Sequence, residues 1–211
     1  MSIRWKVCGM RDSANIREVL ALRPDYMGFI FFEKSPRHAE GVLDPAVTAE
    51  FPDTTIKTGV FVNAPTEYIL QQADTYGLQA LQLHGRETPE QCRELKDKGF
   101  TIFKVFSVGE SFDFDTLAPY VPHVDYFLFD TKGKNLGGNG VVFDWNVLKG
   151  YPYQVPVILS GGIDTDNVSE LDTLQGLPLH GIDVNSRFET EPALKDTQKL
   201  IALTEKISRK G

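Results

Sequence analysis

The sequence contains no apolar run approaching the roughly 20 residues that a membrane-spanning helix needs, so no membrane partner is expected. Its N-terminal stretch, MSIRWKVCGM, lacks a long apolar segment and is expected to be mature sequence rather than a secretory signal. Positive charge is also in deficit, with a formal net charge of −7 at pH 7. Nucleic-acid binding, which needs clustered basic residues, is therefore not expected. A small anionic ligand held by a few local groups stays open.

Cysteine is scarce, since Cys8 and Cys92 are the only two. Two thiols do not form a disulfide framework in a chain of 211 residues, which favours a reducing cytoplasm. Zinc-ligand spacing is missing too, because no second cysteine or histidine lies near Cys8 and the four histidines are scattered. No metal site is therefore expected, and the length favours one domain over residues 1–211.

Short runs rich in valine, isoleucine, phenylalanine and leucine alternate with longer segments of helical spacing. This α/β alternation predicts parallel strands joined by right-handed crossovers. Eight units favour a (β/α)8 TIM barrel over an open doubly wound sheet, as does the lack of GxGxxG after the first strand. The crossover at 106–119 has little helical periodicity and is expected to be short or irregular. The expected strands are 3–7, 26–31, 57–62, 80–83, 101–105, 126–129, 157–159 and 181–184, and the expected helices are 13–22, 44–50, 66–76, 89–98, 116–120, 145–149, 166–174 and 194–209.

Chemistry in such a barrel collects where the strands end. Glycines follow the sixth and seventh strands, and small polar residues such as Ser186 follow the eighth. Backbone N–H groups that converge there can hold a phosphate, because glycine lets the main chain come close. The alternative is that Gly161-Gly162 simply makes a turn, as such pairs often do. Their joint position in barrel order favours the phosphate site.

Cys8 ends the first strand and Asp130 ends the sixth. A free cysteine at an apolar strand end is usually a small buried hydrophobe. Lys6 and Arg11 are nearby cations, however, and a cation lowers a thiol pKa. Burial disfavours the charged form of a carboxyl group, which would suit Asp130 as a general acid, although an aspartate there can also be a turn residue. One acid and one base on separate strands fit an isomerisation.

Three more strand-end residues are candidates for ligand contacts. Arg37 could grip a carboxylate or phosphate through two parallel bonds, or could be a solvated loop residue. His84 could contact the ligand, although a hydrogen-bonded strand-end histidine is favoured, and Asp183 could orient a substrate amine or cap a turn. Cys92 lies in an amphipathic helical segment and is expected to be structural.

These motifs resemble the phosphoribosylanthranilate isomerase family of tryptophan biosynthesis. The resemblance covers the chain from Lys6 to about Asp196. The sequence departs from the family at two positions beside the phosphate site. The family often has threonine where this chain has Asn139, and glycine where it has Arg187. The matching segments are KVCG at 6–9, GFIF at 28–31, KSPR at 34–37, GVFVN at 59–63, LQLHG at 81–85, DT at 130–131, GGNG at 137–140 with FDW at 143–145, SGGI at 160–163 and DVNS at 183–186.

The resemblance implies an Amadori rearrangement of N-(5-phosphoribosyl)anthranilate without a cofactor, in a monomer or homodimer. Asp130 would then be the general acid and Cys8 the general base. A pentose-phosphate epimerase is a rival, but it would use metal-binding His and Asp at several strand ends. A phosphate-ligand binding protein without catalysis is another, and the presence of both Cys8 and Asp130 argues against it. By the same resemblance, the binding residues are Arg37 for the anthranilate carboxylate, Asp183 for the anthranilate nitrogen, His84, and Gly138, Gly140, Gly161, Gly162 and Ser186 for the phosphate.

Overall fold

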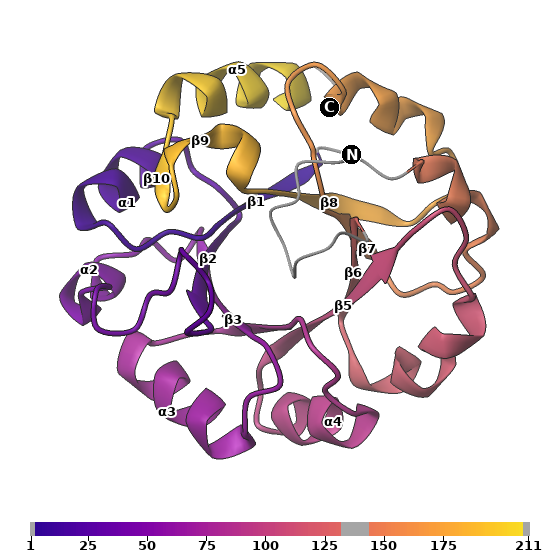
Figure 1. Ribbon diagram of the computed structural model, residues 1–211, viewed down its shortest axis with the longest axis horizontal. Coiled ribbons are helices and arrows are strands. Elements are labelled where there is room, and N and C mark those ends of the chain that lie inside the picture. The colour runs from indigo at the N-terminus through magenta and orange to yellow at the C-terminus, as the bar shows by residue number, and fades with distance from the viewer. Residues whose placement is uncertain (1–2, 132–143, 209–211) are drawn as a thin grey trace.

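Eight parallel strands close into a barrel in a computed structural model that describes residues 3–131 and 144–208 (Figure 1). Each strand pairs with the next in sequence, and β1 pairs with β8 to complete the ring. This confirms the predicted (β/α)8 architecture. The strands are β1 (Arg4–Cys8), β2 (Tyr26–Phe31), β3 (Ile56–Phe61), β4 (Ala80–Leu83), β5 (Thr101–Val108), β6 (Tyr126–Thr131), β7 (Val157–Leu159) and β8 (Leu179–Val184).

Helices surround the barrel (Figure 1), and side chains cap the starts of several of them. The Asp12 carboxylate accepts a hydrogen bond from the Asn15 N–H, and the Thr88 hydroxyl accepts one from the Gln91 N–H. No helix in the described ranges is both long enough and apolar enough to cross a membrane. The α-helices are α1 (Ser13–Leu20), α2 (Pro45–Ala49), α3 (Thr66–Tyr76), α4 (Pro89–Asp97) and α5 (Thr197–Ser208).

The crossovers in the second half of the barrel are irregular, which was expected for the one after β5 but not for the other two. Those after β5, β6 and β7 are 3-10 helices, η1 (Phe114–His123), η2 (Trp145–Gly150) and η3 (Val168–Thr173). In η1 the cause is visible, because Pro119 and Pro122 have no N–H group to donate to an α-helical ladder.

The expected helix at 194–209 was also placed too early. Leu194 and Lys195 form β10 (Leu194–Lys195), which pairs antiparallel with β9 (Glu189–Glu191), and α5 begins only at Thr197. A third departure is η4 (Ser186–Phe188), a single 3-10 turn between β8 and β9. The chain after β8 therefore forms a turn and a two-stranded hairpin beside α1 before its last helix.

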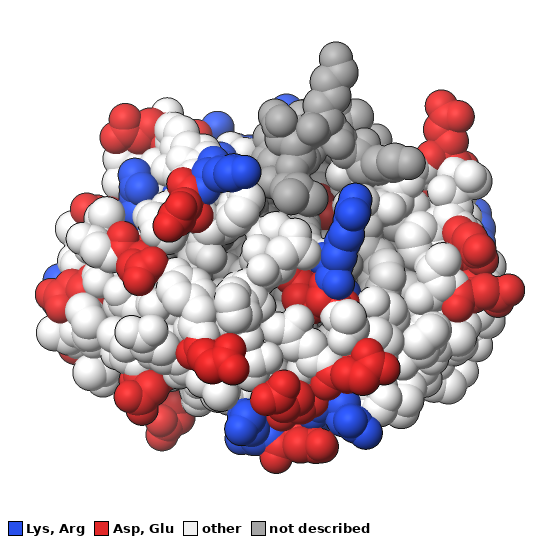
Figure 2. Space-filling view, turned by 60° about the horizontal axis from the view of Figure 1, so that its bottom comes forward, with Lys and Arg blue, Asp and Glu red and all other residues white. Residues whose placement is uncertain are grey.

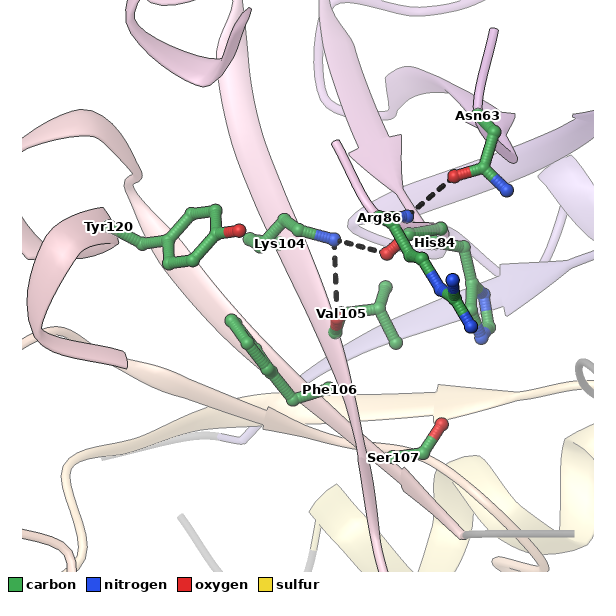
Figure 3. Close-up of a pocket in the computed structure, with 9 residues that line it drawn as sticks. Asn63, His84, Arg86, Lys104, Val105, Phe106, Ser107 and Tyr120 are labelled. Carbon is green, nitrogen blue, oxygen red and sulfur yellow. Dashed lines mark hydrogen bonds between the residues drawn. The ribbon is translucent and has the colours of Figure 1, made fainter. Parts of the chain in front are cut away.

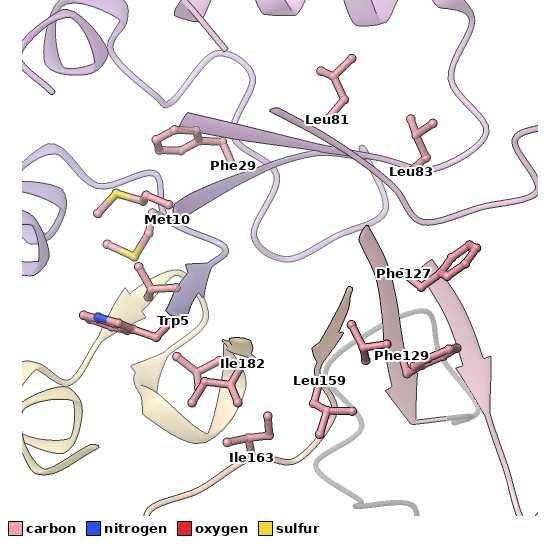
Figure 4. Close-up of a cluster of buried hydrophobic side chains, with 14 of the residues drawn as sticks. Trp5, Met10, Phe29, Leu81, Leu83, Phe127, Phe129, Leu159, Ile163 and Ile182 are labelled. Atoms are coloured by element: carbon pink, nitrogen blue, oxygen red, sulfur yellow. The ribbon is translucent and has the colours of Figure 1, made fainter. Parts of the chain in front are cut away.

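Strand side chains alternate between two layers. Residues such as Phe29, Leu81 and Ile182 point outward into the core beneath the helices (Figure 4). The opposite faces fill the barrel interior with a second cluster of Tyr26, Ala80, Phe103, Val105, Leu128 and Ile158. Aromatic rings close this inner core, since the Tyr126 ring stacks on Phe103 with centroids 4.9 Å apart. The inner apolar cluster fills the middle of the barrel, and inward-facing polar residues such as Cys8, Asp130 and Asp183 lie beyond it at the carboxyl ends of the strands.

Charged side chains of both signs are interspersed over the face shown in Figure 2. On the described part of that face, acidic groups lie among the basic ones, and the lysines and arginines do not merge into one broad patch. This distribution agrees with the net charge of −7.

Candidate active site

Cys8, Asp183 and Asp130 all face the barrel interior at the carboxyl ends of their strands. Their outward neighbours in sequence, such as Val7 and Phe129, belong to the layer beneath the helices. All three polar residues are almost fully buried, with 3%, 5% and 6% of their surface exposed. The barrel thus brings together the predicted base, the predicted acid and a second carboxylate.

Cys8 lies beside a buried ion pair. The Lys6 ammonium contacts the Asp183 carboxylate at 2.9 Å, and Lys6 is entirely buried. Gly28 on β2 makes room for this group, because a Cβ there would lie 2.9 Å from the Cys8 sulfur and 3.0 Å from the Lys6 nitrogen. Burial lowers the pKa of Lys6, but Asp183 and Cys8 more than offset that effect and raise it above its ordinary value.

The sequence left the net pKa shift of the Cys8 thiol open, because that shift depends on burial. Burial raises the pKa of Cys8, and Lys6 and Lys195 oppose that rise without overcoming it. Lys6 lowers the thiol pKa, as expected of a nearby cation, but desolvation outweighs the cations and the net shift is upward. Arg11 has a different role from the one expected, since its guanidinium donates a hydrogen bond to the His38 carbonyl at 3.1 Å.

Arg37 reaches the site already bound to a carboxylate. Its Nε donates to Glu189 at 2.9 Å and its Nη2 at 2.6 Å, a bidentate arrangement that raises the pKa of Arg37. Glu189 also accepts hydrogen bonds from the Lys195 ammonium at 2.5 Å and the Ala193 N–H at 3.1 Å. Gly9, with φ +80°, allows the Arg37 side chain to pass, because a Cβ there would lie 2.6 Å from its Cδ.

The Asp130 carboxylate is held from two sides. Its Oδ1 accepts a hydrogen bond from the Thr131 N–H at 2.8 Å, and its Oδ2 lies 3.5 Å from the His84 Nε2. His84 in turn lies against the amide of Gln82, with its Nδ1 3.4 Å from the Gln82 Nε2. His84 thus has the position of a hydrogen-bonded strand-end histidine, which was the favoured alternative.

The loop after β7 packs directly against the end of β6. Gly161 and Gly162 both have left-handed φ values, +82° and +72°. A Cβ on Gly161 would lie 2.6 Å from the Thr131 nitrogen and 2.7 Å from the Asp130 Oδ1. Ser186 begins the turn η4 after β8 and is partly buried, and Arg187 is exposed. The expected phosphate residues Gly138 and Gly140, with Asn139 between them, lie outside the described residues.

A cavity of about 600 Å³ opens beside His84, where β3, β4 and β5 end (Figure 3). Its volume is within the range of small-molecule sites. Lys104 in the cavity wall is buried and has a structural role, because its ammonium donates hydrogen bonds to the carbonyl of Gly85 at 2.8 Å and to Glu87 at 2.9 Å. The lining residues are Asn63, His84, Gly85, Arg86, Lys104, Val105, Phe106, Ser107 and Tyr120.

The match to a family model decides which family this site belongs to. The model for N-(5'phosphoribosyl)anthranilate (PRA) isomerase matches residues 5–206. This chain belongs to the N-(5'-phosphoribosyl)anthranilate isomerase family. The resemblance drawn from the sequence motifs is confirmed, and the chain is an enzyme with this isomerase activity in tryptophan biosynthesis.

Individual members of the isomerase family match over nearly the whole chain. The isomerase of Parabacteroides distasonis is 45% identical over 92% of this chain and 89% of its own length, and that of Phocaeicola vulgatus is 42% identical over 97% and 98%. Among solved structures, phosphoribosyl anthranilate isomerase from Thermus thermophilus has a TM-score of 0.86 at 26% identity, covering 99% of this chain and 100% of its own. Another phosphoribosyl anthranilate isomerase, solved in complex with reduced 1-(o-carboxyphenylamino)-1-deoxyribulose 5-phosphate, has a TM-score of 0.81 at 26% identity, covering 98% of each chain.

Sequence reasoning missed two residues that the fold of this isomerase brings to the site. Glu189 contacts the predicted Arg37, and Lys195 contacts Glu189 and lies near Cys8. Neither residue had a local sequence signal for a site, and Lys195 was placed in a helix. The two cysteines are free. Cys92 is buried in α4, and burial raises its pKa to about 11, so its thiol is protonated at neutral pH. Among the described residues, no three His, Cys, Asp or Glu side chains come together as they would around a metal ion.

Proposed function

We propose that this isomerase converts N-(5-phosphoribosyl)anthranilate to 1-(2-carboxyphenylamino)-1-deoxyribulose 5-phosphate by general acid/base catalysis, with Asp130 as the acid and Cys8 as the base. The observation that carries the proposal is the shared placement of Cys8, Asp183 and Asp130 on the inward faces of β1, β8 and β6, at the carboxyl ends of the strands. A Brønsted acid and a Brønsted base on separate strands can act on two atoms of one sugar.

The reaction divides into two proton transfers. Asp130 gives its proton to the furanose ring oxygen, the bond from that oxygen to C1 breaks, and the nitrogen lone pair forms a Schiff base at C1. Cys8 as thiolate then removes the proton from C2, and the electron pair moves to the Schiff-base nitrogen to give an enolamine. Tautomerisation of the enolamine yields the ketone, so no electrons enter or leave the substrate.

Substrate binding is assigned to groups around these two residues. Arg37 binds the anthranilate carboxylate with the guanidinium that Glu189 orients, and Asp183 holds the anthranilate nitrogen. Support for the phosphate site comes from the left-handed Gly161 and Gly162 and the turn that begins at Ser186, where main-chain N–H groups can converge. His84 completes the site beside Asp130. Gly138 and Gly140 are assigned to the same phosphate on the resemblance alone.

The test follows the fluorescence of the anthranilate group as substrate made in situ is consumed. Cys8→Ser and Asp130→Asn are each expected to lower kcat by about 10²-fold to 10⁴-fold, the usual contribution of a positioned acid or base. Both variants should still bind a product analogue. Cys92→Ser is the matched control and should keep the wild-type rate, because Cys92 lies buried in α4. Equal rates in all four proteins would refute the assigned roles.

We propose one barrel domain over residues 1–211, acting in the cytoplasm as a monomer or a homodimer. A structure of the isomerase from Thermotoga maritima, with a TM-score of 0.79 at 27% identity, is described as monomers generated from a dimeric enzyme. Sedimentation equilibrium of the purified chain would decide between the two assembly states, and a stable higher oligomer would contradict both.

A further inference from the structure

Lys6 occupies a place in the barrel that a lysine rarely takes. None of its surface is exposed, and its ammonium faces the similarly buried Asp183 carboxylate at 2.9 Å. Taking two such charges out of water is costly, and replacing a buried pair by apolar residues is often neutral or stabilising. Filling the barrel therefore does not by itself account for this pair.

The ammonium also lies against the sulfur of Cys8. Lys6 and Cys8 are two residues apart on β1, so both side chains point into the barrel. A Cβ placed on Gly28 would lie 3.0 Å from the Lys6 Nζ and 2.9 Å from the Cys8 Sγ. Because both atoms are that close to one point, they lie less than about 6 Å from each other. A methyl group on residue 28 would fill the space that both atoms use.

We propose that Lys6 is a positioning residue of this isomerase: its ammonium, held in place by Asp183, stabilises the thiolate of Cys8 and so sets the pH range in which Cys8 acts as the base. The catalytic part of this inference rests on the proposed function of Cys8. The effect of Lys6 on the thiol itself does not.

Other charged groups surround Cys8 besides Lys6, and each is itself paired or opposes the thiolate. Lys195 faces the sulfur from β10, but Glu189 contacts its ammonium at 2.5 Å. Arg37, from the loop after β2, is likewise paired with Glu189. Asp183 on β8 acts in the opposite sense and disfavours the thiolate. Burial raises the pKa of Cys8, and Lys6 provides the largest opposing effect.

The experiment titrates the thiol directly, through the ultraviolet absorbance of the thiolate, in a Cys92→Ser background where Cys8 is the only cysteine. Lys6→Met is expected to raise the apparent pKa of Cys8 by about two pH units, as the loss of a partly screened cation at this separation predicts. Asp183→Asn should lower it by about one pH unit, because an opposing carboxylate is removed. Lys96→Met is the matched control. Lys96 lies on α4, outside the barrel, and its ammonium is paired with Asp125 at 2.9 Å, so its removal should not change the pKa of Cys8.

Opposite shifts in Lys6→Met and Asp183→Asn support the inference, since a merely structural role for the pair would not separate them in sign. An unchanged thiol titration in Lys6→Met overturns it. If Lys6→Met does not fold, Lys6→Gln, which also removes the cation, is titrated in its place, and an unchanged thiol pKa there overturns the inference. The pH profile of kcat is measured alongside. If the thiol pKa moves and the profile does not, the Lys6 assignment stands and the proposed role of Cys8 as the base fails.

Discussion

Gly161→Ala tests how closely the loop after β7 controls the acid at the end of β6. The added methyl group would lie 2.6 Å from the Thr131 nitrogen and 2.7 Å from the Asp130 Oδ1, and it would also meet the Thr131 hydroxyl. The Thr131 nitrogen belongs to the backbone, so it cannot swing aside as the far end of a long side chain could. The loop, the strand end or the Asp130 carboxylate must therefore move.

The magnitude has two parts. A left-handed φ of +82° costs an alanine about 1–2 kcal/mol relative to glycine. Overpacking against a rigid wall adds about 1–3 kcal/mol, so the free energy of unfolding should fall by about 2–5 kcal/mol. A carboxylate displaced by about 1 Å from its productive position can lower kcat by about 10²-fold.

Urea denaturation and steady-state kinetics measure the two effects, and Gly176→Ala is the matched control. Gly176 has a similar φ of +89°, but a Cβ there would meet nothing within 4 Å. The control should lose only the conformational part, about 1–2 kcal/mol, and keep the wild-type kcat. If Gly161→Ala matches Gly176→Ala in both stability and kcat, the steric argument is refuted.

Three further perturbations test other parts of the structure. Lys104→Met leaves the buried Glu87 carboxylate without its cation and should lower the free energy of urea unfolding by about 3–5 kcal/mol. A loss near zero would contradict the structural role of Lys104. Burial lowers the pKa of His180, so the stability it contributes is full above its unfolded pKa of 6.5 and is lost as the pH falls below that value. His180→Phe should therefore flatten the decline in unfolding free energy between about pH 7 and pH 5, and an unchanged slope would refute this. Arg17→Ala should leave stability and kcat unchanged, because both side chains of the Arg17–Glu50 pair are exposed to solvent. A measurable loss of either would contradict a surface role for this pair.

The barrel could be read from the sequence because its signal is local. Alternating or continuous apolar runs mark each strand, and three of them, at 26–31, 80–83 and 157–159, have the predicted bounds. The order of the strands then follows from chain connectivity alone. The irregular crossover after β5 was expected from its lack of helical periodicity, and Pro119 and Pro122 within η1 are the physical reason.

The surroundings of the site were beyond a sequence reading, because they join distant residues. Arg37 and Glu189 are 152 positions apart, and only the closed barrel with its β9–β10 hairpin brings them into contact. The direction of the Cys8 pKa shift had the same difficulty. Lys6 could be seen beside Cys8 in the sequence, but whether burial or the cation prevails depends on solvent access in three dimensions.

The bond between Arg37 and Glu189 has a consequence for how the anthranilate carboxylate would be captured. A free arginine side chain samples many rotamers and loses about 2 kcal/mol of conformational entropy when it is fixed. Here the bidentate contact with Glu189 has already removed that freedom. The guanidinium is thus aligned before any ligand arrives, and the ordering cost falls on the folding of the chain instead of on substrate association.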